Sequence, residues 1–204
     1  MSETLTARPA LAGIALPGRH GTGNGAPGVT LRERTDLGVV AVMARKGQGE
    51  ALRMAVASAY RATLPDTARY LAGQTVGFVG TGPGQWLAVS ASLGGGALAV
   101  DLTAKLAGLA SVSDQGDGRA VIRIAGPRAR DVLAKGLPID LHPSVFAPGS
   151  AATSIISLMG VTLWQVDETP AYDLVVFRSL AVSFWSWLTD SAAEYGYEVV
   201  PATN

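Results

Sequence analysis

Histidine and cysteine, the side chains most often used for metal binding and nucleophilic chemistry, are scarce in this sequence. Among 204 residues there are two histidines and no cysteine. Disulfides, thiolate zinc sites, iron–sulfur clusters and a cysteine nucleophile are therefore excluded, and a metal site would need almost all its ligands from scattered carboxylates. His20 lies in a glycine-rich stretch and His142 in a predicted loop. We expect neither histidine to be a catalytic base.

Two pairs of nearby acids are the remaining candidates for acid–base catalysis: Asp114 with Asp117, and Asp167 with Glu168. A catalytic pair needs two different environments that separate the pKa values of its carboxyl groups. Both pairs fall in predicted turns, where solvated acids are common. The sequence therefore favours solvated turns over a catalytic pair.

Glycines at two places are candidates for a phosphate-binding loop. The segment GTGPGQW, residues 80–86, has no following Lys-Ser or Lys-Thr and lies between two predicted strands, so we interpret it as a turn. The glycines at positions 94–96 precede a predicted helix, but no G-x-G-x-x-G pattern continues from them. We interpret them as a flexible connection. We therefore expect no catalytic, cofactor-binding or metal-binding residue on this chain.

The charge of the chain is balanced and low. Sixteen basic residues offset sixteen acidic ones, so the electrostatic footprint of a nucleic-acid or anionic-membrane binder is missing. Charged residues make up 16% of the chain, whereas an average soluble domain has about 25%. Either part of the surface is buried against another protein, or the chain has a large core rich in alanine and glycine. Composition leaves both explanations open.

Neither a membrane-spanning helix nor a signal peptide is predicted. The longest apolar runs, residues 174–177 and 180–188, fall well short of the roughly 20 residues that cross a bilayer. The first residues lack a basic stretch followed by a long apolar run and a cleavage pattern. We expect a cytoplasmic protein.

Three segments are predicted along the chain. Residues 1–30 contain GRHGTGNGAPG and are predicted to be a tail or linker that, if ordered, lies along a partner rather than in the core. Residues 31–116 form a first module in the order β-α-β-β-α-β. Its elements are a strand at 37–45, a helix with Leu52, Val56 and Ala59 that Pro65 ends, a hairpin of 74–80 and 85–90, a helix with Leu98, Leu102, Leu106 and Leu109, and a strand at 110–114.

Residues 117–204 repeat this order in a diverged form, β-α-β-β-β-α. The expected elements are a strand at 120–124, a helix at 126–136, two strands on either side of Gly160, a strand at 171–179 and a C-terminal helix that ends at Gly196. The sequence therefore predicts the α+β class, with two split βαβ (ferredoxin-like) modules whose sheets are antiparallel or mixed and covered by helices on one face, packed as one compact unit.

The C-terminal helix is apolar on more than one side. Leu180, Phe184 and Leu188 mark one face, together with Trp187, whereas Val182 and Trp185 project elsewhere. This pattern indicates a second packing surface for a partner. The alternative is that Trp185 packs under a neighbouring loop of the same chain, because tryptophan is frequent both in cores and at interfaces.

The middle and end of the chain resemble the gamma subunits of heterotetrameric sarcosine oxidases. The resemblance covers roughly residues 75–197, and its most specific parts are SVSDQGDGRAVIRIAGPRARDVL, KGLPIDLHPSVF and YDLVVFRS leading into the aromatic helix. It implies a fold like the folate-binding domain of the glycine-cleavage T-protein. No catalytic aspartate of that protein matches a position here, so no folate-binding residue is carried over.

The resemblance also implies a function in a complex. The family's oxidase demethylates sarcosine to glycine with release of hydrogen peroxide, and with tetrahydrofolate it forms 5,10-methylenetetrahydrofolate. Alpha, beta and delta subunits would be the partners, and FAD, FMN, NAD, zinc and the folate site would belong to them. This chain would then be a non-catalytic structural subunit. The alternatives are the corresponding subunit of N-methylglutamate dehydrogenase and a free-standing folate-binding aminomethyl transferase.

Overall fold

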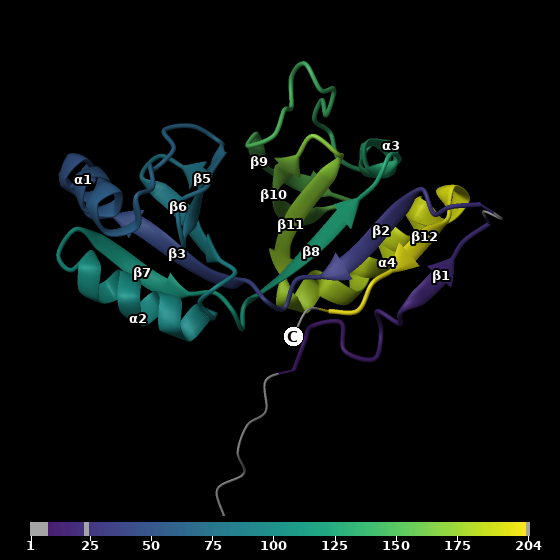
Figure 1. Cartoon of the computed structure of the whole chain (residues 1–204), viewed down its shortest axis with the longest axis horizontal. Coiled ribbons are helices and arrows are strands. Elements are labelled where there is room, and N and C mark those ends of the chain that lie inside the picture. Colours follow the sequence, from purple (N-terminus) through teal and green to yellow (C-terminus); the bar gives the residue numbers. More distant parts are fainter. Residues whose placement is uncertain (1–7, 23–24, 203–204) are drawn as a thin grey trace, which may run out of the picture.

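The computed structural model describes residues 8–22 and 25–202, which form two β-sheets with helices on their outer faces (Figure 1). The first sheet has five strands in the order β4-β5-β6-β3-β7, and the second has seven in the order β1-β12-β2-β8-β11-β10-β9. None of the helices in the described ranges is long and apolar enough to span a bilayer.

The first sheet follows the split βαβ pattern that the sequence predicts. Its elements in chain order are β3 (Gly38–Ala44), α1 (Gly49–Tyr60), β4 (Tyr70–Leu71), β5 (Gly77–Gly82), β6 (Gln85–Ser90), α2 (Gly95–Lys105) and β7 (Ala110–Asp114). Strand β3 lies between β6 and β7, and all the pairings are antiparallel. The α+β class and the mainly antiparallel sheets are thus confirmed.

The second sheet contains strands from both ends of the chain. Its elements are β1 (Gly18–His20), β2 (Val29–Glu33), β8 (Arg119–Ala125), α3 (Ala129–Ala134), β9 (Ala151–Ile156), β10 (Met159–Asp167), β11 (Ala171–Phe177), η1 (Arg178–Leu180), α4 (Ala181–Ala192), η2 (Ala193–Tyr195) and β12 (Tyr197–Val199). Strand β2 inserts between β8 and β12 and runs parallel to β12. The two sheets are therefore interleaved in sequence.

The N-terminal region differs from the predicted tail. Within residues 8–22 and 25–30, Leu11 is buried in the core of the second sheet, and the strand Gly18–His20 pairs with β12. The Glu33 carboxylate accepts hydrogen bonds from the backbone N–H groups of Ala10 (2.7 Å) and Leu11 (3.1 Å). The glycine-rich composition hid this role, because backbone pairing and one buried leucine leave little trace in a hydrophobic pattern.

The predicted boundary at residue 31, between the tail and the first module, remains a prediction. The division of the strands between the two sheets does not follow it. Residues 29–33 lie across this division and belong to the second sheet. Strands β1, β2, β4 and β12 were not predicted, because they are short and most begin beside glycine or within polar sequence.

Three element boundaries also differ from the prediction. Helix α1 ends at Tyr60, with Arg61 in the left-handed conformation (φ 49°), and Tyr60 rather than the exposed Ala59 continues its buried face. Helix α2 ends before Leu109. The two strands near Gly160 turn at Ser157–Leu158, where both residues have positive φ, and Gly160 lies inside β10.

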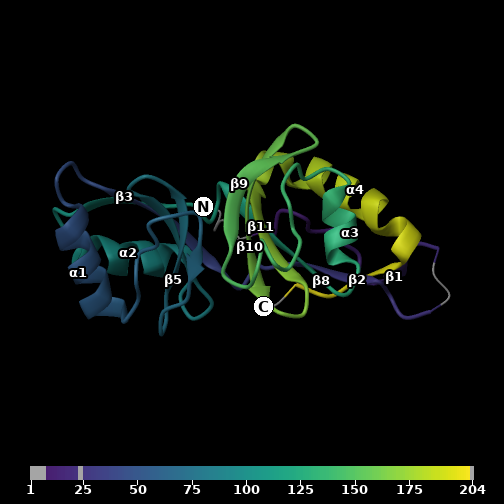
Figure 2. The same cartoon turned by 90° about the horizontal axis from the view of Figure 1, so that it is seen from above.

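Side chains alternate between the two faces of each sheet, and this alternation creates three apolar layers. Helices α1 and α2 cover one face of the first sheet, and α3 and α4 cover one face of the second (Figure 2). The opposite faces meet each other through a third cluster. That inter-sheet cluster comprises Val39, Val79, Leu87, Val89, Val121, Ala151, Trp164 and Val175.

We expect Leu11→Ala to lower the free energy of unfolding by about 2–5 kcal/mol, because the side chain is 1% exposed and its removal leaves a cavity. Leu16→Ala is the matched control, since Leu16 is 61% exposed, and it should change the free energy by less than about 0.5 kcal/mol. Urea denaturation of both variants measures the difference. Equal effects would show that the N-terminal segment does not contribute to the core.

Candidate functional site

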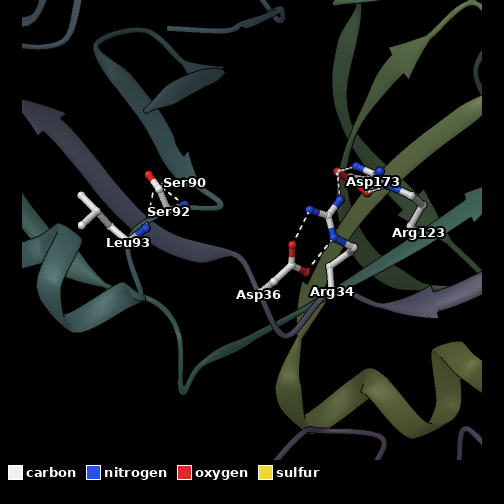
Figure 3. A network of polar contacts seen from close by, with 7 residues as sticks. All are labelled: Arg34, Asp36, Ser90, Ser92, Leu93, Arg123 and Asp173. Atoms are coloured by element: carbon white, nitrogen blue, oxygen red, sulfur yellow. Dashed lines mark hydrogen bonds and ion pairs between the residues drawn. The ribbon is translucent and has the colours of Figure 1, made fainter. Parts of the chain in front are cut away.

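A group of charged residues lies between the two sheets, where the apolar inter-sheet cluster ends (Figure 3). Strand alternation positions two of them. In β8, Arg123 shares the inward face with Val121, and in β11, Asp173 shares it with Val175. The two residues are direct cross-strand neighbours in the register of β8 and β11.

Asp173 is the centre of this inter-sheet charge cluster. It is 2% exposed, and its two carboxylate oxygens accept hydrogen bonds from Nε and Nη2 of Arg123, each at 2.7 Å. On its other side, Nη1 of Arg34 lies 3.6 Å from Asp173 Oδ2. Arg34 in turn donates two hydrogen bonds to Asp36, at 2.8 and 2.7 Å. Two arginines and two aspartates thus neutralise one another.

The pKa shifts of Arg34 and Asp36 favour their ionised forms. Hydrogen bonding to Arg34 is the main reason that the pKa of Asp36 lies below its ordinary value. The hydrogen bond to Asp36 raises the pKa of Arg34, although burial opposes this. Burial, and then the charge of Asp173, raise the pKa of the nearby Tyr70 hydroxyl, whose ring packs against Trp164 at 5.6 Å between centroids. The pKa values of Asp36 and Tyr70 are therefore shifted away from neutral pH. Such shifts suit a fixed ion-pair network better than proton transfer.

Three cavities open beside the layer between the sheets. One of about 190 Å³ adjoins the charge cluster and is lined in part by Arg34, Tyr70, Ser90 and Trp164. In its wall, Ser90 Oγ donates to Thr75 O (2.7 Å) and accepts from the N–H groups that follow it (Figure 3). A second, of about 500 Å³, lies near the start of α2, and a third, of about 320 Å³, lies where β3 and β6 face β10.

The histidines lie apart from the charge cluster. His20 is exposed on β1 and stacks on the Tyr197 ring at 5.2 Å. His142 is exposed in the loop before β9, with Nδ1 2.7 Å from Ser144 Oγ. Within the part of the chain that the structure describes, no three His, Cys, Asp or Glu side chains gather closely enough to hold a metal ion.

Asp114 and Asp117 are brought together with the glycines at 94–96 in the wall of the 500 Å³ cavity. Both acids are exposed, and Asp114 Oδ1 accepts a hydrogen bond from Gly116 N–H at 2.8 Å. The same oxygen lies 2.5 Å from the position that a Cβ on Gly95 would take. An acidic side chain therefore already lies against the first turn of α2, which leaves this turn poorly suited to an added phosphate.

The other candidates are turns and core residues. Asp167 and Glu168 are exposed at the end of β10, and residues 80–86 form the β5–β6 hairpin. On α4, Trp185 is 5% exposed and belongs to the core of its own chain, whereas Val182 is 48% exposed. Trp185 therefore does not supply the second packing surface that the sequence suggested, and the alternative in which it packs within its own chain describes it better.

Sequence reasoning missed the charge cluster. A signal was present, because Arg123 and Asp173 are single charged residues inside the apolar strand segments AVIRIA and AYDLVVF. A charge in such a run is costly to bury unless it is paired. Which residues pair could not be read from the sequence, because β8 and β11 are separated by some 50 residues.

Known proteins provide three comparisons. Residues 44–194 match the family model "Sarcosine oxidase, gamma subunit family". The chain is 34% identical over 186 residues to sarcosine oxidase subunit gamma of Arthrobacter sp, covering 87% of each chain. It is 33% identical over 181 residues to the same subunit of Corynebacterium sp. (strain P-1), again covering 87% of each.

Solved structures show the same likeness. A chain of the heterotetrameric sarcosine oxidase from Corynebacterium sp. U-96 matches with a TM-score of 0.77 and 26% identity, over 93% of this chain and 96% of that one. The glycine cleavage system aminomethyltransferase T from Bartonella henselae matches with a TM-score of 0.60 and 15% identity, over 86% of this chain and 48% of that one. The second likeness shows a shared fold and nothing more.

Asp173→Asn should lower the free energy of unfolding by about 3–5 kcal/mol, because it leaves the partly buried Arg34 and Arg123 facing a buried, uncharged amide. Asp167→Asn removes an exposed acid from the same sheet and should cost less than about 0.5 kcal/mol. Chemical denaturation at neutral pH compares the two. A small loss for Asp173→Asn would mean that the charge cluster does not hold the sheets together.

The stabilising effect of Asp36 should depend on pH. Because its pKa in the folded protein is depressed below the ordinary value of 3.8, its ion pair stabilises the fold fully above that value. The stabilisation is lost as the pH falls through the lower folded pKa. The difference in unfolding free energy between wild type and Asp36→Asn should therefore shrink in acid. A difference that stays constant down to about pH 2 would contradict this assignment.

Proposed function

This chain belongs to the sarcosine oxidase gamma subunit family, and from that premise we propose that it is a non-catalytic structural subunit of a heterotetrameric sarcosine oxidase. Its partners would be the alpha, beta and delta subunits. The complex would oxidatively demethylate sarcosine to glycine with hydrogen peroxide, and with tetrahydrofolate would form 5,10-methylenetetrahydrofolate. The other subunits would bind FAD, FMN, NAD, zinc and tetrahydrofolate. The complex would be cytoplasmic, in keeping with a chain that has no cysteine.

The internal pairing of the charge cluster is the observation that supports a structural role. The charges on Asp173, Arg123 and Arg34 pair with one another where the second sheet meets the connection between β2 and β3. Groups used in this way would hold the second sheet against the connection that leads into the first. They are not arranged as an acid and a base with separate environments, which catalysis would require.

The family match also suits the low charge of the chain. A subunit that is covered by partners needs fewer solvated charges than a free protein of the same size. The oxidase relatives are matched over 87% of their own length, so the likeness extends over nearly the whole subunit.

Purification through a tag on this chain from its own host should recover a flavin-containing complex with three further polypeptides. Native mass spectrometry gives their masses, and the absorption spectrum of the same sample shows flavin. Turnover of the complex should be faster with sarcosine than with N-methylglutamate, which separates the oxidase from N-methylglutamate dehydrogenase. A lone colourless chain that binds tetrahydrofolate in a titration would overturn the structural role and favour a free-standing aminomethyl transferase.

A further inference from the structure

Strand β9 is the outer strand of the second sheet, and half of its free edge is open. Its start is covered, because Ala151 N–H donates to Ala68 O at 3.1 Å. Gln165 N–H donates to Ser150 O, so the antiparallel alternation turns the backbone groups of Thr153 and Ile155 away from β10. Both residues are exposed, and β9 has no strand partner other than β10 within the described residues.

The sequence of this edge lacks the features that normally prevent a strand from pairing with another chain. Strand β9 reads AATSII, with no charge and no proline, and its register with β10 contains no bulge. Free proteins protect such edges with lysine, proline or bulges, because an apolar open edge is a template for strand addition. An edge of this composition is expected to be covered in the working form of the protein.

Exposed apolar side chains lie at the end of the β9 edge. Ile155 is 50% exposed, and at the adjoining turn Leu158 is 93% exposed. Ser157 and Leu158 have φ of 46° and 69°, which is the geometry of a two-residue type I′ hairpin turn. That turn favours asparagine and glycine, and a leucine there is strained and gains nothing from burial within its own chain.

A positive charge lies in the cleft that Thr153 of β9 lines, on β8, with β11 and β10 between it and the edge. The 320 Å³ cleft is lined by Thr153 and Thr162 from β9 and β10, by Met43 from the first sheet, and by Arg119 and Phe177. The Arg119 guanidinium stacks over the Phe177 ring at 3.9 Å, and its buried Nε has no hydrogen-bond partner among residues 8–22 and 25–202. Burial lowers the pKa of Arg119 and is the only cause of its shift. This is expected for a cation without a nearby carboxylate.

We propose that an extended, apolar segment of another subunit adds as a strand to the open edge of β9 and covers Leu158 and Ile155, and that the continuation of this segment enters the 320 Å³ cleft and places a carboxylate against Arg119. The backbone groups of Thr153 and Ile155 select an extended segment, the exposed leucine and isoleucine select apolar side chains, and Arg119 selects the acid. This inference rests on the proposed function, because it assigns the partner to the complex.

A second copy of this chain fits the surface less well. Pairing of β9 with β9 would bring residues 150–158, SAATSIISL, against the cleft, and this segment has no carboxylate to offer Arg119. The two copies would instead contribute two unpaired arginines near one interface. Charge complementarity therefore favours a different polypeptide.

Leu158→Gly separates a docking role from a folding role, because the two roles predict opposite effects. Glycine accepts positive φ without strain, so the Tm of the isolated chain should rise by about 2 °C. Loss of the exposed leucine should weaken association by about tenfold, read as the fraction of tagged chain recovered in the complex by native mass spectrometry. Val100→Ala, which trims a 72% exposed side chain on α2, should leave recovery unchanged.

Arg119→Met tests the charge separately, since methionine retains much of the apolar contact with Phe177. It should also reduce recovery of the complex while the isolated chain remains folded by circular dichroism. Recovery equal to wild type for both Leu158→Gly and Arg119→Met, in a preparation where wild type assembles, would overturn the β9 docking site alone. Failure of the wild-type chain to recover any partner would overturn the proposed function instead.

Hydrogen exchange of peptides spanning residues 150–158 tests strand addition directly. In the isolated full chain the amides of Thr153 and Ile155 should exchange rapidly, and in the complex they should be protected. Protection in an isolated monomer would show that another part of this chain covers the edge, and protection in an isolated dimer would show a second copy. Either result, or equally fast exchange in the complex, would contradict the proposal.

Discussion

The buried carboxylate of Asp173 is the contact on which the arrangement of the two sheets depends. It receives Arg123 from the neighbouring strand and Arg34 from the connection between β2 and β3. Burying the Asp173 carboxylate is costly, and its pairing with the two partly buried arginines compensates for the cost. An ion-pair network of this kind adds less net stability than apolar residues would, but it permits only one relative position of the groups that form it.

The connection that carries Arg34 also explains why the position of the sheets matters. Strand β2 completes the second sheet, and the chain then passes directly into β3 at the centre of the first. The return from β7 to β8 crosses the same boundary. The sheets are thus joined by two covalent connections, the apolar inter-sheet cluster and the charge cluster. In this arrangement the β9 edge and the cleft that Thr153 lines form one surface.

Much of the fold follows from the sequence, and the exceptions have physical reasons. The helices and most long strands were predictable because their apolar residues repeat with a clear period. The roles of Leu11, β1 and β2 were hidden, because they depend on backbone pairing between ends of the chain that lie far apart in sequence. The charge cluster left a local signal in Arg123 and Asp173, but its partners depend on the register of β8 with β11. Burial of Trp185 in its own core could not be told from an interface by helical spacing alone.

In the proposed function, this chain holds the oxidase together and takes no part in the chemistry. The most direct measurement is sarcosine-dependent oxygen consumption per bound flavin, for the complex produced with and without this chain, together with the half-life of each preparation. If the chain is structural, intact flavin-containing particles should turn over at similar rates in both preparations, while those without the chain should lose activity sooner. Stable particles with full flavin content but no turnover in the absence of this chain would contradict it.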